Sequence, residues 1–258
     1  MFGGFTNTMS VFIQAILDAA NIDYAIKLKL IAAKDHKNAP GLYIAFQVGN
    51  SDLIKRYMEI ILTSNLINYK DKIQLIAAKD GQTKSYGLCL ALGLGHSDTV
   101  SVYVKLILNS EIIQYKDKII LLKGVNGHKK SGLLRAITDG QTSSILNYIT
   151  LILESKLNLE DKLSLVAPDL GIENGGLKDI LKFAWQMKHV EMVRNYKTIL
   201  LHSELKEVPI IEELVKYINQ LESFKPSESL YSLGFFDNNT PTTPKPVIPQ
   251  SDKKNIKL

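Results

Sequence analysis

Residues 87–98 read Gly-Leu-Cys-Leu-Ala-Leu-Gly-Leu-Gly-His-Ser-Asp, a short apolar phrase that closes on the glycine at position 95. That glycine belongs to a set that recurs at intervals of 45, 46 and 45 residues. The set consists of Gly4, Gly49, Gly95 and Gly140. The apolar phrase recurs as well, as Gly41-Leu42-x-x-Ala45-Phe46 and Gly132-Leu133-x-x-Ala136-Ile137. Self-similarity at such a period is typical of stacked repeats that share one continuous core.

A long helix is predicted after each of these glycines. A Ser or Thr stands two residues later, where its side chain can accept a hydrogen bond from an unpaired N–H of the first turn. These expected N-caps are Thr6, Ser51, Ser97 and Thr142. Eight residues after each glycine comes an aromatic residue, and an apolar triplet follows at helical spacing. The aromatic residues are Phe12, Tyr57, Tyr103 and Tyr148, with Tyr196 in a fifth unit. We expect the tyrosines to form an internal ladder rather than a surface on which nucleic-acid bases stack.

A third helical phrase follows each long helix. It reads Tyr-Lys-Asp-Lys-Ile at 69–73 and 115–119, and Leu-Glu-Asp-Lys-Leu at 159–163. Asn68 and Asn158 stand three residues before an aspartate, an arrangement that resembles a capping box. We interpret the Lys-Asp-Lys runs as solvated first turns of helices. The sequence therefore predicts an all-α solenoid with a period of about 45 residues and three helical pieces per repeat.

The repeats are predicted to occupy residues 1–223. The first repeat is expected to be incomplete, because the chain starts immediately before its long helix. The fifth is degenerate, since Lys188 replaces the glycine and Val190 replaces the cap, and a helix at 209–221 is expected to close the stack. Residues 224–258 are rich in Pro, Ser, Thr and Lys. Such a composition buries too little apolar surface to offset its ordering entropy, which predicts a disordered tail.

Composition excludes several classes of protein. The net charge is +5, of which the tail holds five lysines against three acids, so nucleic acid is not an expected partner. No apolar run approaches the roughly 20 residues of a membrane-spanning helix. The first ten residues lack the pattern of a secretory signal peptide. The single cysteine, Cys89, excludes an intramolecular disulfide.

The sequence offers little for catalysis. Cys89 is the only thiol, and His96 follows seven residues later. A catalytic pair needs a base within hydrogen-bond reach and a third group that orients it, and packing roles explain both residues more simply. The other histidines have no metal-site spacing. We predict no catalytic residue, metal ligand or cofactor.

The repeat phrase points to a family. The period is closer to HEAT and armadillo repeats than to the roughly 33 residues of ordinary ankyrin repeats. The Gly-His turn at 95–96, however, is similar to the ankyrin short helix and its turn. With the repeated phrases Leu-Ile-Ala-Ala-Lys-Asp at 30–35 and 75–80, the chain resembles the ankyrin-like repeat region of type III secreted effectors of enteric bacteria. These are the enterotoxin-2-like and OspC-like proteins, and the resemblance runs from about residue 4 to residue 203.

That resemblance implies a protein-binding module that recognises a host protein, located in the bacterial cytoplasm before secretion and then in the host cell. It also implies that catalysis belongs to a preceding half of the effector. We expect this half to be missing, so that the chain is not an enzyme by itself. One alternative is part of an effector enzyme whose cysteine protease-like or ADP-ribosyl-transferring half is supplied elsewhere. Another is a structural adaptor that self-associates through an open N-terminal edge at Met1, Phe2, Phe5 and Phe12.

Candidate partner contacts lie where the repeats vary. The connections at 34–40, 79–86, 123–131 and 168–175 differ among repeats, and such loops often form the binding face of a repeat stack. Residues of the short helices that point away from the core in the ankyrin pattern would lie beside them. The candidates are Ile44, Gln47, Lys79, Lys84, Leu90, His128, Lys129, Lys130 and Arg135. The lysines predict a basic edge that suits an acidic protein surface, and the alternative is that these loops are merely hydrated.

Overall fold

The computed structural model describes residues 3–170 and 176–224, which belong to one compact unit. Every regular element among the described residues is helical, which confirms the predicted all-α class. Outside the helices, two isolated antiparallel bridges join Lys34 to Pro40 and Val125 to Ser131. The predicted disordered tail lies outside the described residues except for Phe224.

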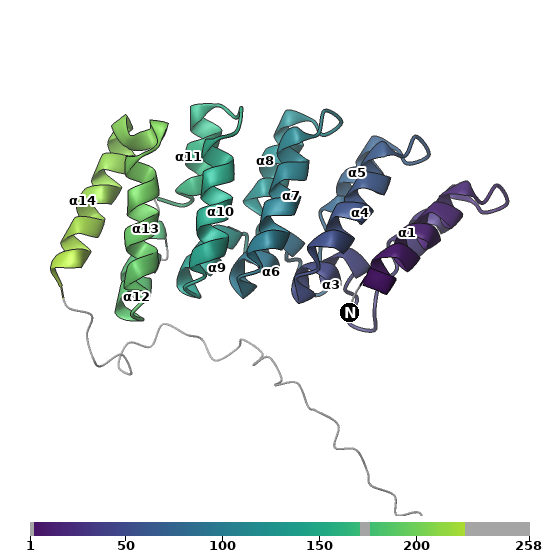
Figure 1. The fold of residues 1–258 in the computed structure, drawn as a ribbon, viewed down its shortest axis with the longest axis horizontal. Helices are drawn as coiled ribbons and strands as arrows, with labels where there is room; N and C mark the ends of the chain where they lie inside the picture. The colour runs from purple at the N-terminus through teal and green to yellow at the C-terminus, as the bar shows by residue number, and fades with distance from the viewer. Residues whose placement is uncertain (1–2, 171–175, 225–258) are drawn as a thin grey trace, which may run out of the picture. The chain divides into compact units, whose positions relative to one another are not determined.

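Three kinds of helix alternate along the chain (Figure 1). The short helices are α3 (Gly41–Val48), α6 (Gly87–Leu94), α9 (Gly132–Thr138) and α12 (Leu177–Gln186). The long helices are α1 (Gly3–Asp18), α4 (Ser51–Thr63), α7 (Ser97–Asn109), α10 (Thr142–Leu153) and α13 (Val190–Leu201). The third helices are α2 (Tyr24–Ile31), α5 (Tyr69–Ile76), α8 (Tyr115–Lys123) and α11 (Leu159–Val166). A 3₁₀ helix (Glu204–Glu207) and α14 (Pro209–Ser223) follow. Each long helix packs against the next long helix, and each short helix against the next short helix.

A left-handed glycine joins each of the short helices α3, α6 and α9 to its long helix. Gly49 has φ +71°, and the N–H of Asn50 donates to the carbonyl of Ala45 at 3.0 Å. This is the Schellman arrangement, which needs a residue that tolerates positive φ. Gly95 and Gly140 repeat it at φ +78° and +68°.

The predicted caps of the long helices were wrong by one residue. Ser51, Ser97 and Thr142 are the first helical residues, and the N-caps are Asn50, His96 and Gln141. Thr6 lies inside α1. The Schellman turn ends at the residue after the glycine, so the next helix starts sooner than the cap pattern alone suggests. The Asn50 side chain accepts from the N–H of Leu53 at 2.9 Å, whereas His96 and Gln141 make no side-chain cap bond.

The glycines are also contact points between repeats. A Cβ built on Gly49 would lie 2.7 Å from His96 Nδ1, and one on Gly140 would lie 2.5 Å from His189 Nδ1. At Gly95 the nearest atom is the Gln141 side-chain oxygen, at 2.2 Å. The side chain that precedes each long helix thus covers the glycine of the preceding repeat. Glycine is required here for its positive φ and for this close approach.

In the degenerate repeat, Lys188 occupies the glycine position with φ +67°. Lys188→Gly is expected to stabilise the folded state by about 1 kcal/mol, because glycine adopts this conformation without steric cost. Urea unfolding followed by circular dichroism measures the change. The matched control is Lys182→Gly inside α12, which should destabilise by about 1 kcal/mol. Equal effects of the two substitutions would contradict the argument.

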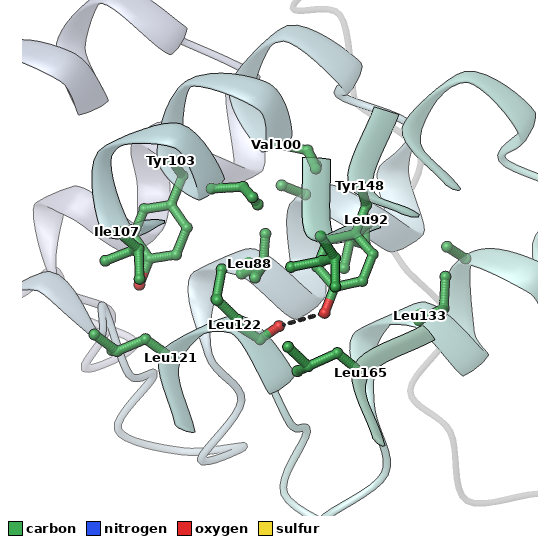
Figure 2. Close-up of a cluster of buried hydrophobic side chains, with 14 of the residues drawn as sticks. Leu88, Leu92, Val100, Tyr103, Ile107, Leu121, Leu122, Leu133, Tyr148 and Leu165 are labelled. Carbon is green, nitrogen blue, oxygen red and sulfur yellow. Dashed lines mark hydrogen bonds between the residues drawn. The ribbon is translucent and has the colours of Figure 1, made fainter. Parts of the chain in front are cut away.

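The core tyrosines form the predicted internal ladder. Tyr57, Tyr103, Tyr148 and Tyr196 are all buried. Figure 2 shows Tyr103 and Tyr148 among Leu88, Leu92 and Val100, with the Tyr148 hydroxyl donating to the carbonyl of Leu122 at 2.9 Å. Tyr103 donates to Ile76 at 3.1 Å, and Tyr196 donates to Val166 at 2.7 Å. The hydroxyls of Tyr103, Tyr148 and Tyr196 therefore each satisfy a carbonyl near the end of the preceding repeat's third helix.

Helix α14 lies where the sequence predicts a helix, at 209–221. Its buried face consists of Ile211, Leu214, Ile218 and Leu221, and it packs on α12 and α13. Its opposite face is polar, with exposed Glu212, Glu213, Lys216 and Gln220. The Trp185 indole N–H donates to the carbonyl of Phe224 at 3.1 Å, which holds the chain to the body just beyond this helix.

Candidate functional site

The connections between repeats form hairpins of one design. We call them hairpin 1 (residues 34–40), hairpin 2 (79–86) and hairpin 3 (123–131). Residues 171–175 of the fourth predicted connection lie outside the described residues. Backbone N–H groups of Asp35, Asp80 and Asn126 donate across them at 3.0, 2.9 and 2.9 Å. The side-chain oxygens of the same three residues accept N–H groups inside their own loops. These turns give each hairpin a defined conformation.

The hydrogen bonds inside hairpin 1 also affect ionisation. The Asp35 carboxylate accepts the N–H groups of Ala39 and Lys37, each at 2.9 Å. The bond from Ala39 is the main cause that lowers the pKa of Asp35 below its ordinary value, and the bond from Lys37 adds to it. The ionised carboxylate is therefore the form that holds this loop closed.

Neighbouring hairpins contact each other directly. The N–H of Gly81 donates to the carbonyl of Asn38 at 3.1 Å, and that of Tyr86 donates to Val125 at 3.0 Å. The residues predicted to contact a partner therefore lie on two adjacent hairpins. Hairpin 2 carries Lys79 and Lys84, and hairpin 3 carries His128, Lys129 and Lys130. All five of these side chains are exposed.

Two lysines of hairpin 2 have local partners. The Lys79 ammonium lies 5.4 Å from the centre of the Tyr86 ring, a cation–π contact. The Lys84 ammonium donates to the carbonyl of Gly81 at 2.6 Å. Both contacts leave the charged groups at the surface, where a partner can approach them.

The four short-helix candidates differ in exposure. Gln47 and Arg135 are exposed, whereas Ile44 and Leu90 are partly buried. Arg135 extends over Gly93 of α6, where a Cβ would lie 2.6 Å from its Nε. Its Nε also lies 3.4 Å from Asp139 Oδ2. The side chain thus bridges α6 and α9 while its charge remains accessible.

Tyr43 was missed by sequence reasoning. It lies on α3, half-buried, and burial is the main cause that raises its pKa, while a hydrogen bond with Thr83 opposes the rise. Asp80 and Arg135 are close enough to act on its charge. Tyr43 occupies the position of Cys89 and Leu134 in the next two repeats, so the available signal was a polar aromatic at an otherwise apolar position.

Cys89 and His96 have the packing roles that we expected. The Cys89 thiol is fully buried, and burial raises its pKa to about 11, which disfavours the nucleophilic thiolate. His96 Nε2 lies 3.0 Å from the carbonyl oxygen of Gln47 and so donates to it. Among the described residues, no three His, Cys, Asp or Glu side chains are placed to hold a metal ion.

The interpretation of the Lys-Asp-Lys runs as solvated was wrong for the second lysine. Lys72 is only 8% exposed, and its ammonium donates to the carbonyl of Leu62 at the end of α4, at 2.8 Å. The same bond recurs from Lys27 to Leu17, Lys118 to Leu108 and Lys162 to Leu153. A cation at a helix C-terminus is favoured by unpaired carbonyls and by the helix dipole. The repeat period of the sequence does not show that this lysine side chain points toward the end of the preceding long helix.

The aspartates of these runs join neighbouring third helices. The Tyr24 hydroxyl donates to Asp71 at 2.6 Å, and the Tyr115 hydroxyl donates to Asp161 at 2.6 Å. Tyr69 donates to Asp117 in the same way. The predicted caps are confirmed, since Asn68 and Asn158 accept the N–H groups of those aspartates. These polar residues serve the contacts between repeats.

No family model, curated protein or solved structure matches this chain. No helix among the described residues is long and apolar enough to cross a lipid bilayer. The chemistry and geometry of the chain's own surface are therefore what indicate its function.

Proposed function

We propose that the chain is an ankyrin-like helical solenoid that binds a protein partner through its hairpins and the exposed positions of α3, α6 and α9. One observation carries this proposal. The glycines, the core tyrosines and the third-helix lysines keep their chemistry from repeat to repeat and are engaged in packing, whereas two sets of equivalent positions at this surface change chemistry while staying at least partly exposed. Ile44, Leu90 and Arg135 are equivalent to one another, as are the hairpin residues Asn38, Lys84 and Lys129.

The composition of this surface supports a protein partner. Apolar side chains at Ile44 and Leu90 lie on helices that pack against each other, and Arg135 follows on the next helix. Protein interfaces commonly combine an apolar centre with arginine and a polar rim. The lysines of hairpins 2 and 3 would form part of that rim. Variation on a constant framework is how repeat proteins acquire different partners.

The resemblance to type III secreted effectors supports a host protein as the partner. In this proposal the chain acts as the recognition module of a bacterial secreted effector, and any catalytic half is a separate segment. The enzyme alternative differs in outcome, because the bound host protein would then be cleaved or ADP-ribosylated. An unchanged mass of the bound partner favours the recognition module.

Site-specific photocrosslinking in host-cell lysate tests the proposal. A photoreactive residue is placed at Gln47 and at His128, with a control at Glu213 on the outer face of α14; all three positions are exposed. We expect one host protein to crosslink from Gln47 and from His128 but not from Glu213. Absence of a common product, or equal capture from Glu213, would refute binding at this surface.

Self-association is a second candidate, because the side of the molecule formed by α1 and α2 exposes apolar residues. Val11, Phe12 and Ile26 are 69%, 52% and 51% exposed. Phe12 and Ile26 are equivalent to the buried Tyr57 and the hydrogen-bonded Asp71 of the next repeat. A photoreactive residue at Val11 in the purified protein should crosslink to a second copy if this edge self-associates. Met1 and Phe2 lie outside the described residues, as does the side chain of Phe5.

A further inference from the structure

We propose that hairpins 2 and 3 bind an acidic, carboxylate-bearing segment of the partner protein, with Lys84, Lys129 and Lys130 as the cationic contacts. This inference rests on the protein-binding function proposed above and adds the chemistry of the partner.

The two hairpins carry positive charge without an exposed carboxylate. Lys79, Lys84, Lys129 and Lys130 are all exposed. The carboxylate of these hairpins belongs to Asp80, which is only 5% exposed. Its Oδ2 accepts hydrogen bonds from the N–H and the hydroxyl of Thr83, each at 2.6 Å. Asp80 is thus engaged inside its own loop, and the surface of the two hairpins is cationic.

The two hairpins also place their lysines in equivalent positions. Lys84 has φ +58° and Lys129 has φ +62°, so both side chains leave a left-handed residue of the turn. The hairpin backbones touch, because a Cβ built on Gly127 would lie 2.0 Å from the carbonyl oxygen of Thr83. Two ammonium groups are therefore presented from adjacent, similarly shaped turns, which suits a segment that carries more than one carboxylate.

Folding by itself does not favour lysine at these two positions. Left-handed residues are preferably glycine or asparagine, because longer side chains meet steric cost there. Hairpin 1 has asparagine at the equivalent position, Asn38, with φ +65°. The Lys84 ammonium has a bond to Gly81 that assists its loop, whereas the exposed Lys129 contributes charge at the turn. Backbone conformation therefore does not account for the charge at these two turns.

The surroundings favour an acidic protein over nucleic acid. A nucleic acid would be held mainly through its phosphates, for which these two hairpins supply only their four exposed lysines. Ile44 and Leu90 of the proposed surface add partly exposed apolar area. Lysines beside apolar residues complement a protein surface in which acids surround an apolar contact.

Fluorescence anisotropy with the full chain tests the inference. The probes are a labelled peptide of Glu and Leu, the same peptide with Gln in place of Glu, and a single-stranded oligonucleotide. The variant Lys84→Asn/Lys129→Asn removes two charges and introduces the residue that hairpin 1 already uses. The matched control, Lys70→Asn/Lys116→Asn, removes the same charge from exposed positions of α5 and α8.

We expect the wild type to prefer the Glu peptide, with binding that weakens as salt is added. The hairpin variant should lose about tenfold in affinity while its Tm stays equal or rises, and the control should lose less than about threefold. Equal losses in both variants, tighter binding of the oligonucleotide or no preference for the Glu peptide would each overturn the inference.

The affinity of the crosslinked host protein is measured for the wild type and for the hairpin variant. This comparison separates failure of the acidic-segment inference from failure of the proposed function. If that protein binds the hairpin variant as tightly as the wild type, the acidic-segment inference fails while protein binding stands. If no common protein crosslinks from Gln47 and His128, the proposed function itself fails.

Discussion

Gly140→Val is expected to destabilise the folded state by about 3 kcal/mol or more, as measured by urea unfolding. Two costs add. Gly140 has φ +68°, a conformation that costs a β-branched residue about 1–2 kcal/mol. In addition, a Cβ at this position would lie 2.5 to 2.7 Å from the Nδ1, Cε1 and Cγ atoms of His189, and overpacking of this kind costs about 1–3 kcal/mol. The first cost is local, and the second acts between α9 and α13.

A double-mutant cycle separates these two costs. In a His189→Ala background the ring is absent, so Gly140→Val should retain the backbone strain and lose most of the steric penalty. We expect a coupling of about 1 kcal/mol or more between the two positions. If Gly140→Val costs the same free energy in both backgrounds, contact with His189 is not part of the role of this glycine.

Alkaline pH is expected to unfold the protein cooperatively between about pH 10 and pH 12. Burial raises the pKa of Tyr57, Tyr103, Tyr148 and Tyr196 well above the ordinary value of 10.0. A raised folded-state pKa contributes stability that is fully present below pH 10 and is lost as pH rises beyond it. Each tyrosine removes about 1.4 kcal/mol per pH unit, so the four remove on the order of 5 kcal/mol by pH 11. Far-UV circular dichroism, recorded as the pH is raised, measures this unfolding.

The variant Tyr103→Phe/Tyr148→Phe is the control for this mechanism. It removes two of these four buried hydroxyls. The part of the pH-dependent loss of unfolding free energy that comes from the four tyrosines should therefore be about half as large above pH 10. At neutral pH it should cost about 1–3 kcal/mol, since the carbonyls of Ile76 and Leu122 lose their donors. All other titratable groups are common to both proteins. Identical pH slopes of the two proteins would contradict the account.

The sequence by itself determined the features that depend on local periodicity. Helical spacing of apolar residues around Tyr57, Tyr103 and Tyr148 predicted both the long helices and the buried tyrosines, because a residue's place on a helix follows from its number. The caps at Asn68 and Asn158 were predictable for the same reason, since donor and acceptor lie three residues apart. The all-α class and the positions of the connections also followed from the period.

Only the tertiary structure decided the contacts between repeats. Three such contacts join residues that are 10 to 49 positions apart in the sequence. They are the hydrogen bond from Lys72 to Leu62, the hydrogen bond from Tyr24 to Asp71, and the packing of His189 over Gly140. The candidate surface depends on the same kind of contact, because hairpins 2 and 3 become one cationic edge through the bond from Tyr86 to Val125. A sequence period reports which residues are equivalent. Which equivalent residues touch is decided when the helices pack and each buried polar group must find a partner.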